Sequence, residues 1–156
     1  MDGQLLGGKM ELLEILKTAV DNSASDIFII SGAALSYKAN GSVYKINDMP
    51  MPTAETKRIV HDIYSLAGFN FDSENMPDKE MDFSVSVKGM GRFRANIYKQ
   101  RGSYAAVLRY VPFELPDAQT LGIPDTVMRL SKGKSGIVLV TGPAGIGKST
   151  MSAPGI

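Results

Sequence analysis

The hydrophobic positions at the start of the chain repeat with two different periods. Over residues 10–20 they recur every three or four residues, which predicts an amphipathic helix. Residues 26–30 are almost wholly apolar and predict a short buried strand. Two further strand-like runs flank Asn40-Gly41, a dipeptide that favours the tight turn of a β-hairpin. The pattern therefore predicts a helix, a strand and a hairpin in that order.

The middle of the chain changes from a helical pattern to alternation. Thr53 can cap a second helix, and Gly68 can end it in a left-handed conformation. Residues 70–80 are acidic and predict a loop. Three later segments alternate in polarity and are joined by short glycine-containing connections, which favours antiparallel hairpins: residues 81–87, 92–99 and 103–111. We therefore expect residues 1–111 to form one α+β domain, an antiparallel sheet with helices.

The pattern weakens after these alternating segments. Residues 112–124 contain three prolines and little periodicity, so they predict a linker. A short helix is expected over residues 124–131, and residues 136–141 are apolar on both faces, as in a strand inside a parallel sheet. Only six residues follow Thr150. We therefore expect residues 125–156 to be the truncated beginning of an α/β domain.

Charge and composition exclude several classes of function. The 156-residue chain has 17 basic and 16 acidic residues, and its formal charge of +1 gives no overall field that would attract nucleic acid. The absence of cysteine excludes disulfides, thiolate zinc sites and cysteine nucleophiles. No stretch approaches the roughly 18 apolar residues of a membrane-spanning helix. We expect a cytoplasmic protein with no nucleic-acid partner, which could reach the inner face of the cell membrane only through partner proteins.

One segment carries a phosphate-binding pattern. Residues 142–149 fit G-x-x-x-x-G-K-[ST], the Walker A pattern, and an apolar strand-like run precedes them, as the pattern requires. Glycines let backbone amides curl around a phosphate, Lys148 would reach the β and γ phosphates of ATP, and the Ser149 hydroxyl would bind Mg²⁺. A glycine-rich turn without a ligand is the alternative, but the coincidence of strand, loop, lysine and serine favours nucleotide binding. The expected ATP-binding residues are Gly142, Pro143, Ala144, Gly145, Ile146, Gly147, Lys148, Ser149 and Thr150.

Hydrolysis of ATP needs more than this loop. P-loop enzymes also use an acidic Walker B residue on another strand and a group that positions the attacking water. The acidic residues upstream belong to the first expected domain, and we expect them to be solvated: Asp72, Glu74, Asp78, Glu80 and Asp82. We therefore expect negligible ATP turnover from these 156 residues alone.

Several segments occur in an order that is typical of one family: Ala24-Ser25-Asp26, Met81-Asp82-Phe83-Ser84, residues 91–96, Val107-Leu108-Arg109 and residues 136–150. With these segments the chain resembles the retraction-type ATPases of type IV pili, which serve twitching motility, within the wider secretion ATPase superfamily. The resemblance implies a PAS-like N-terminal domain, a linker and a RecA-like ATPase domain, with ATP and Mg²⁺ as cofactors. It also implies assembly into a hexameric ring and partners in the inner-membrane platform of a pilus or secretion system.

The resemblance further implies a role for two arginines. Arg94 and Arg109 lie where the family places arginines that contact ATP, with Arg92 and Arg101 as weaker candidates. In the alternating segment 92–97 the polar residues share one face, from which a guanidinium can meet phosphate oxygens. The residues alone favour an ordinary solvated sheet face with pairing to acidic neighbours across strands. The resemblance reverses that preference for Arg94 and Arg109.

The chain departs from the family pattern at several positions. Phe28 stands where the family commonly has histidine, and Ala144 and Ile146 replace the usual threonine and serine inside the loop. Residues 151–156 do not resemble the family's continuing helix. We therefore expect an ATP-binding N-terminal fragment of a pilus retraction ATPase, monomeric or a domain-swapped dimer, whose full-length relatives couple ATP hydrolysis to pilus disassembly. The alternative is a stand-alone PAS-like oligomerisation or sensing module with a vestigial P-loop and no catalysis.

Overall fold

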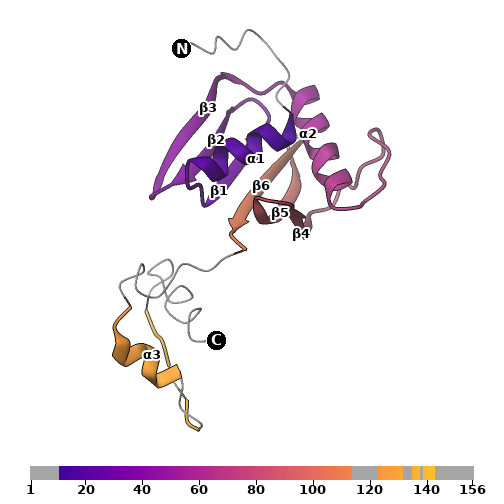
Figure 1. Cartoon of the computed structure of the whole chain (residues 1–156). Helices are drawn as coiled ribbons and strands as arrows, with labels where there is room; N and C mark the ends of the chain where they lie inside the picture. The colour runs from indigo at the N-terminus through magenta and orange to yellow at the C-terminus, as the bar shows by residue number, and fades with distance from the viewer. Residues whose placement is uncertain (1–10, 114–122, 132–134, 138, 143–156) are drawn as a thin grey trace. The chain divides into compact units, whose positions relative to one another are not determined.

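The structure, a computed structural model, divides into two compact units, Met1–Phe113 and Glu114–Ile156. It describes residues 11–113, 123–131, 135–137 and 139–142 (Figure 1). The first of these stretches belongs to the first unit, and the three shorter ones belong to the second.

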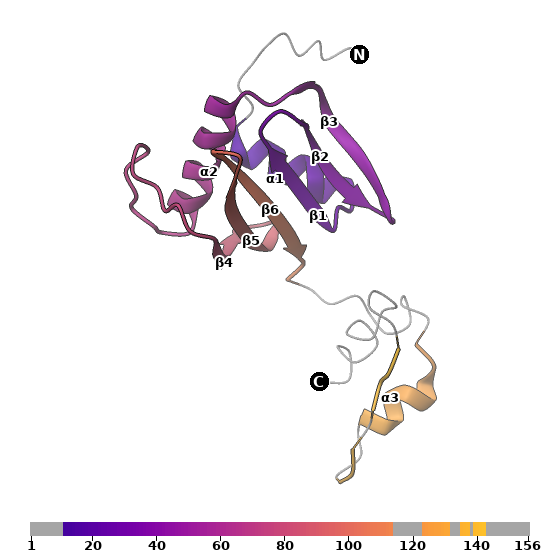
Figure 2. The same cartoon turned by 180° about the vertical axis from the view of Figure 1, so that it is seen from behind.

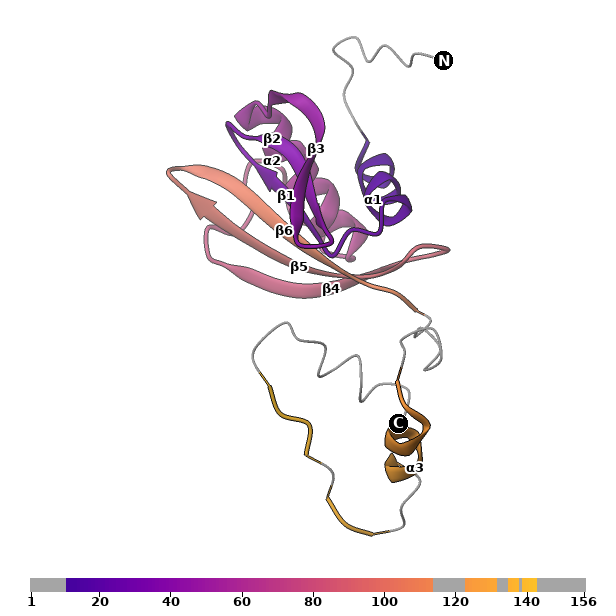
Figure 3. The same cartoon turned by 90° about the vertical axis from the view of Figure 1, so that its left-hand side faces the viewer.

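A six-stranded sheet forms the first unit, with the strand order β3-β2-β1-β6-β5-β4. All five neighbouring pairs are antiparallel. The central pair joins β1 to β6, two strands that are far apart in the sequence, and Figure 3 shows β4, β5 and β6 as one curved layer. The strands are β1 Asp26–Ile30, β2 Ala34–Ala39, β3 Ser42–Pro50, β4 Met81–Val87, β5 Gly91–Gln100 and β6 Ser103–Val111.

Two helices, α1 Leu12–Asp21 and α2 Thr53–Leu66, cover one face of this sheet. In Figure 1 α1 lies in front of the strands, and in Figure 2 it lies behind them. Glu11 and Glu14 form a capping box that satisfies free backbone N–H groups at the start of α1. The apolar faces of α1 and α2 pack against the inward-facing residues of the strands and form one buried core. Its fully buried members include Ile15, Leu16, Ile59, Ile63, Phe93, Ile97 and Leu108.

The hairpin expected at Asn40-Gly41 is confirmed, since both residues have positive φ angles, 50° and 81°. The turn between β5 and β6 repeats this geometry at Arg101-Gly102, with φ angles of 51° and 79°. The three strands expected after residue 80 are also present. The α+β fold expected from the sequence is therefore confirmed.

In the second unit the structure describes one helix, α3 Asp125–Ser131. The strand expected over residues 136–141 is not formed in the part of that range that is described. Ile137 and Leu139 are instead 88% and 81% exposed. A strand needs the N–H and C=O groups of a neighbouring strand, and the described part of this unit offers none. The Walker A residues after Gly142 lie outside the described residues.

Two features are absent from the part of the chain that the structure describes. None of its helices combines the length and apolar character needed to cross a bilayer. None of its acidic and histidine side chains gather in a group of three that could hold a metal ion.

Candidate functional site

The helix-free face of the sheet carries the candidate arginines. Along β5, Phe93, Ala95 and Ile97 are buried towards the helices, so the residues between them point to the opposite face. Arg94 lies on this opposite face, as the alternation predicts. On β6 the same alternation buries Leu108 and exposes Arg109.

Arg94 is held by a carboxylate on the neighbouring strand. Its Nε donates to Asp82 Oδ1 at 2.9 Å, and its Nη2 donates to Asp82 Oδ2 at 2.8 Å. Two parallel bonds of this kind fix the plane of a guanidinium. The side chain is nevertheless 64% exposed, so most of the group remains accessible.

Arg109 is held by a carboxylate on β1, the strand that neighbours β6 on the side away from Arg94. Its Nε donates to Asp26 Oδ1 at 3.0 Å, and Ser25 Oγ donates to Asp26 Oδ2 at 2.9 Å. The carboxylate of Asp26 is only 13% exposed, whereas the Arg109 side chain is 69% exposed. Both terminal nitrogens of Arg109 lack a hydrogen-bond partner among the described residues.

The strand register places these groups in one row. Arg94 is the direct cross-strand partner of Arg109, and Asp26 is the direct partner of Arg109 on the other side. On β4 the direct partner of Arg94 is Ser84, and Asp82, two residues before it, reaches Arg94 diagonally. Asp82, Arg94, Arg109 and Asp26 therefore lie on neighbouring strands, β4, β5, β6 and β1; we call these four residues the charge row. Together with Asn96 they line an open pocket of about 310 Å³.

Charge and hydrogen bonding act together on the exposed pair. The hydrogen bonds from Arg94 are the main reason that the pKa of Asp82 lies below its ordinary value, and the positive charge of Arg94 adds to this effect. The same hydrogen bonds raise the pKa of Arg94. Near neutral pH, Asp82 is therefore ionised and Arg94 is charged.

Two guanidinium groups presented side by side can bind an oxyanion that carries several oxygens. Each group is planar and donates in a fork that matches phosphate geometry. The free terminal nitrogens of Arg109 are available at once, and a phosphate can also compete with Asp82 for the exposed Arg94. Both carboxylates of the charge row accept hydrogen bonds from its arginines. The arrangement therefore supports the binding of an oxyanion.

The structure separates the four arginines that the sequence singled out. Arg94 and Arg109 are brought together in the pocket. Arg92 shares the face of Arg94 but pairs across the sheet with Val111, outside that pocket. Arg101 lies in the β5–β6 turn, at the other end of the strand. Of the ATP-binding residues predicted from the Walker A pattern, only Gly142 is among the described residues.

The acidic residues upstream do more than the solvation that was expected. They are exposed, but all five also have partners: Asp72 with Asn75 and the Glu74 backbone, Glu74 with Lys57, Asp78 with Lys99, Glu80 with Asn96 and Asp82 with Arg94. The pairing of β4 with β5 creates the last two contacts because it places Asp82 opposite Asn96. Sequence reasoning missed Asp26 as the partner of Arg109, since the two residues are 83 positions apart.

Comparison with known proteins gives the family. The model of the type II/IV secretion system protein family matches residues 9–153. Because this match covers nearly the whole sequence, the chain belongs to that family, and the resemblance stated from the sequence is confirmed.

Two of the individual relatives are type IV pilus ATPases. Type IV pilus ATPase PilU of Pseudomonas aeruginosa is 32% identical over 92% of this chain and 37% of that protein. Type IV pilus retraction ATPase PilT of the same organism is 33% identical over 92% of this chain and 41% of that protein. The chain thus spans about two fifths of the length of these relatives.

Solved structures give the same picture for the fold. The pilus retraction motor PilT with bound ADP has a TM-score of 0.70 and 38% identity, over 93% of this chain and 42% of that one. The ATPase DotB of Legionella pneumophila has a TM-score of 0.77 and 26% identity, over 99% of this chain and 43% of that one. The antiparallel sheet with its two helices is therefore an architecture that the chain shares with motor ATPases.

Proposed function

We propose that this chain is the nucleotide-binding N-terminal part of a type IV pilus retraction ATPase. The observation that carries the proposal is the side-by-side display of Arg94 and Arg109 on the helix-free face of the sheet. Membership of a family whose similar members are pilus ATPases supports it. One similar solved structure, PilT, holds ADP, which is the product of ATP hydrolysis.

The nucleotide itself is assigned to the Walker A segment. In the proposal, the backbone amides of residues 142–150 surround the phosphates, Lys148 contacts the β and γ phosphates, and the Ser149 hydroxyl binds Mg²⁺. Substitution of the usual residues by Ala144 and Ile146 leaves the backbone donors in place, so the loop keeps its means of binding phosphate.

The two arginines are assigned to phosphate oxygens of a nucleotide. Asp82 and Asp26 keep the guanidinium groups extended over the sheet while no nucleotide is present. This arrangement lowers the entropy lost on binding because the long side chains are already ordered. When phosphate arrives, the terminal nitrogens of Arg109 meet it first, and Arg94 exchanges Asp82 for phosphate.

The domain boundaries and the assembly belong to the same proposal. Residues 1–111 form the PAS-like domain, residues 112–124 the linker and residues 125–156 the start of a RecA-like domain. The whole protein couples ATP hydrolysis to pilus disassembly as a hexamer, in contact with platform proteins at the inner membrane. Relatives that are type IV pilus ATPases support this part.

Direct titration with Mg·ATP tests the proposal. We expect saturable binding of a fluorescent ATP analogue to the unaltered chain, and loss of that binding in the Lys148→Ala variant. Lys17→Ala, at an exposed position on α1 of the first unit, is the matched control because it also removes one positive charge. Binding that is equal in all three proteins, or absent from all three, would refute the assignment.

A stand-alone sensing or oligomerisation module is the second candidate, because residues 11–113 contain a buried core of their own. Light scattering with and without Mg·ATP separates the two candidates. The motor assignment requires nucleotide to bind. The module assignment requires self-association that is the same at every nucleotide concentration.

A further inference from the structure

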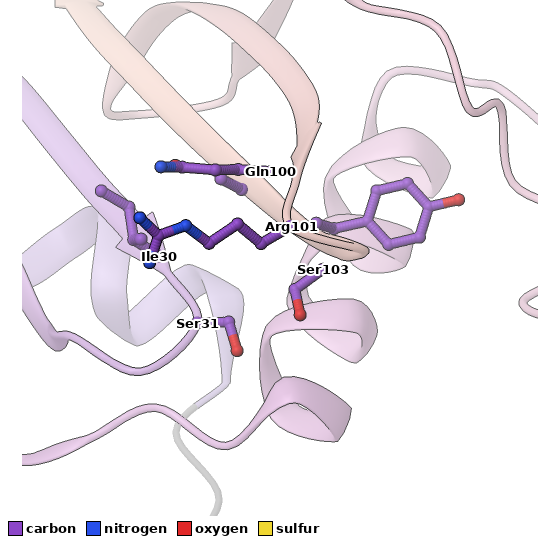
Figure 4. Close-up of a pocket in the computed structure, with 7 residues that line it drawn as sticks. Ile30, Ser31, Gln100, Arg101 and Ser103 are labelled. Carbon is purple, nitrogen blue, oxygen red and sulfur yellow. The ribbon is translucent and has the colours of Figure 1, made fainter.

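A second pocket lies at the opposite end of β5 from the charge row (Figure 4). It has a volume of about 160 Å³ and is formed where the end of β1 meets the β5–β6 turn. Arg101 comes seven positions after Arg94, which corresponds to roughly 23 Å at the usual rise per residue of a strand. The two pockets are therefore separate sites.

The polar groups of this second pocket are almost all hydrogen-bond donors or can act as donors. Its polar side chains include Ser31, Gln100, Arg101 and Ser103, and no carboxylate is among the described residues that line it. Two hydroxyls, an amide and a guanidinium together form a donor set suited to an oxyanion. We call these four residues the turn pocket.

Arg101 carries a positive charge that is not compensated nearby. It has no ion pair and no side-chain hydrogen bond among the described residues, whereas the adjacent Lys99 is paired with Asp78. The charge row differs in this respect, because both of its arginines already have a carboxylate partner. The turn pocket is thus a small concave surface whose cation has no partner within the described part of the chain.

The backbone places Arg101 in this pocket at a conformational cost. Arg101-Gly102 has nearly the same positive φ angles as Asn40-Gly41. Asparagine is favoured at that first turn position, whereas most other side chains are strained there. The turn therefore holds Arg101 in a fixed place where a residue chosen for the turn alone would be asparagine.

The serine on the facing side is also held in place. Ser31 Oγ lies 2.8 Å from Thr53 Oγ1 at the first residue of α2, and the Ser31 backbone forms a bridge with Met51. Figure 4 shows the Arg101 side chain extended across the pocket towards Ile30, with Gln100 and Ser31 on either side of it. The donors thus come from two different segments of the chain.

We propose that the turn pocket binds a phosphate-type oxyanion, separately from the nucleotide site. The anion is either free in solution or carried by an anionic lipid headgroup, and its oxygens accept hydrogen bonds from Arg101, Ser31, Ser103 and Gln100. The pocket volume accommodates one such group.

Nuclear magnetic resonance with inorganic phosphate tests the proposal residue by residue. The ¹⁵N-labelled Lys148→Ala protein is titrated with phosphate at constant ionic strength, so that the Walker A segment does not contribute. We expect saturable shifts of the Ser31, Gly102 and Ser103 amides. Arg101→Asn keeps a residue that suits the turn but removes the guanidinium, and it should weaken binding about tenfold or more.

Two further arms make the outcome decisive. Arg101→Lys keeps the charge but not the fork, so we expect intermediate affinity. Sedimentation with phosphatidylglycerol vesicles, against phosphatidylcholine vesicles as the control, distinguishes lipid-borne from free phosphate: Arg101-dependent sedimentation identifies the lipid as the source. The proposal would be overturned by phosphate-induced shifts that do not saturate, that are unchanged in Arg101→Asn, or that appear only around the charge row. The one exception is Arg101-dependent binding to the vesicles, which would identify the lipid as the source of the phosphate.

Discussion

Arg94 and Arg109 are direct cross-strand partners, yet each is bonded to a carboxylate on the side away from the other. Like charges directly opposite each other destabilise a sheet. Asp82 and Asp26 offset that repulsion and keep the two guanidinium groups extended. The positive and negative charges of the charge row therefore balance without a ligand, and Arg94 can exchange its carboxylate partner for phosphate.

The exchange leads to a prediction for Asp82. In the Asp82→Asn variant Arg94 loses its charged competitor, so a phosphate no longer has to displace a carboxylate. We expect affinity for Mg·ATP to rise by about threefold to tenfold, because a charged hydrogen-bond partner has been removed from the competition. Asp78→Asn, which removes an acidic partner of Lys99 outside the charge row, should leave the affinity unchanged. Weaker binding in Asp82→Asn would contradict the competition between Asp82 and phosphate for Arg94.

The pKa of Asp82 gives a test that needs no ligand. The bond from Arg94 holds this pKa below 3.8 in the folded protein, so the pair stabilises the fold above that pH. This stabilisation is lost as the pH falls through the lowered pKa. In Arg94→Gln we expect the pKa of Asp82 to move back up towards 3.8. Titration of the Asp82 carboxyl carbon by ¹³C nuclear magnetic resonance measures it, and an unchanged pKa would contradict the bidentate geometry.

Gly91 at the start of β5 is a second structural test. It has a φ angle of +147°, and a Cβ there would lie 2.6 Å from Cε2 of Tyr110 and 3.0 Å from the carbonyl oxygen of Val111. We expect Gly91→Ala to lower the free energy of unfolding by about 3 kcal/mol, through strain and overpacking together.

Gly89, in the same turn region, is the matched control for Gly91. It also has a positive φ angle, +78°, but an added Cβ would meet no atom within 4 Å. We expect Gly89→Ala to cost only about 1 kcal/mol, from backbone strain alone. Urea unfolding of both variants measures the difference, and equal losses would contradict the tight contact at Gly91.

The hydroxyl of Tyr64 is buried in the core without a hydrogen-bond partner among the described residues. The side chain is fully buried and stacks on Phe83. We expect Tyr64→Phe to raise the free energy of unfolding by about 1 kcal/mol. Tyr104→Phe should lower it by a similar amount, because the Tyr104 hydroxyl donates to the Met76 carbonyl oxygen at 2.9 Å.

The pH dependence of stability provides a second measure of Tyr64. Burial is the main reason that its pKa is raised from 10.0 to about 12. A tyrosine in the unfolded chain ionises first, so the folded protein loses stability as the pH rises from about 10 towards 12. Tyr64→Phe should remove that part of the loss. An identical alkaline profile in both proteins would contradict the burial of the hydroxyl.

Local patterns predicted those parts of the fold that depend on neighbouring residues. The Asn40-Gly41 turn follows from the backbone preferences of two residues, and the outward position of Arg94 follows from strict alternation on β5. The strand-like run after Gly41 ends at Ile46 in the sequence, whereas β3 continues to Pro50. Asn47 explains the extension, because its side chain accepts a hydrogen bond from the Leu35 backbone where the register with β2 shifts.

The pairing of distant segments could not be read in this way. Asp26 and Arg109 meet only because β1 pairs with β6, and nothing in either segment specifies that partner. The prediction of a strand over residues 136–141 was wrong for the described part of that range, and the reason is related. An apolar run becomes a strand only beside another strand, and apolarity alone does not supply one.

The affinity of the charge row for nucleotide is the decisive quantity for the proposed function. Calorimetric titration compares Mg·ATP binding by the unaltered chain with binding by Arg94→Gln, Arg109→Gln and the double variant, with Arg92→Gln as the control on the same strand. We predict a loss of about tenfold or more in each single variant, a larger loss in the double variant and no change in the control. Equal affinity in all five proteins, with folding intact, would contradict the assignment of the two arginines to nucleotide phosphates.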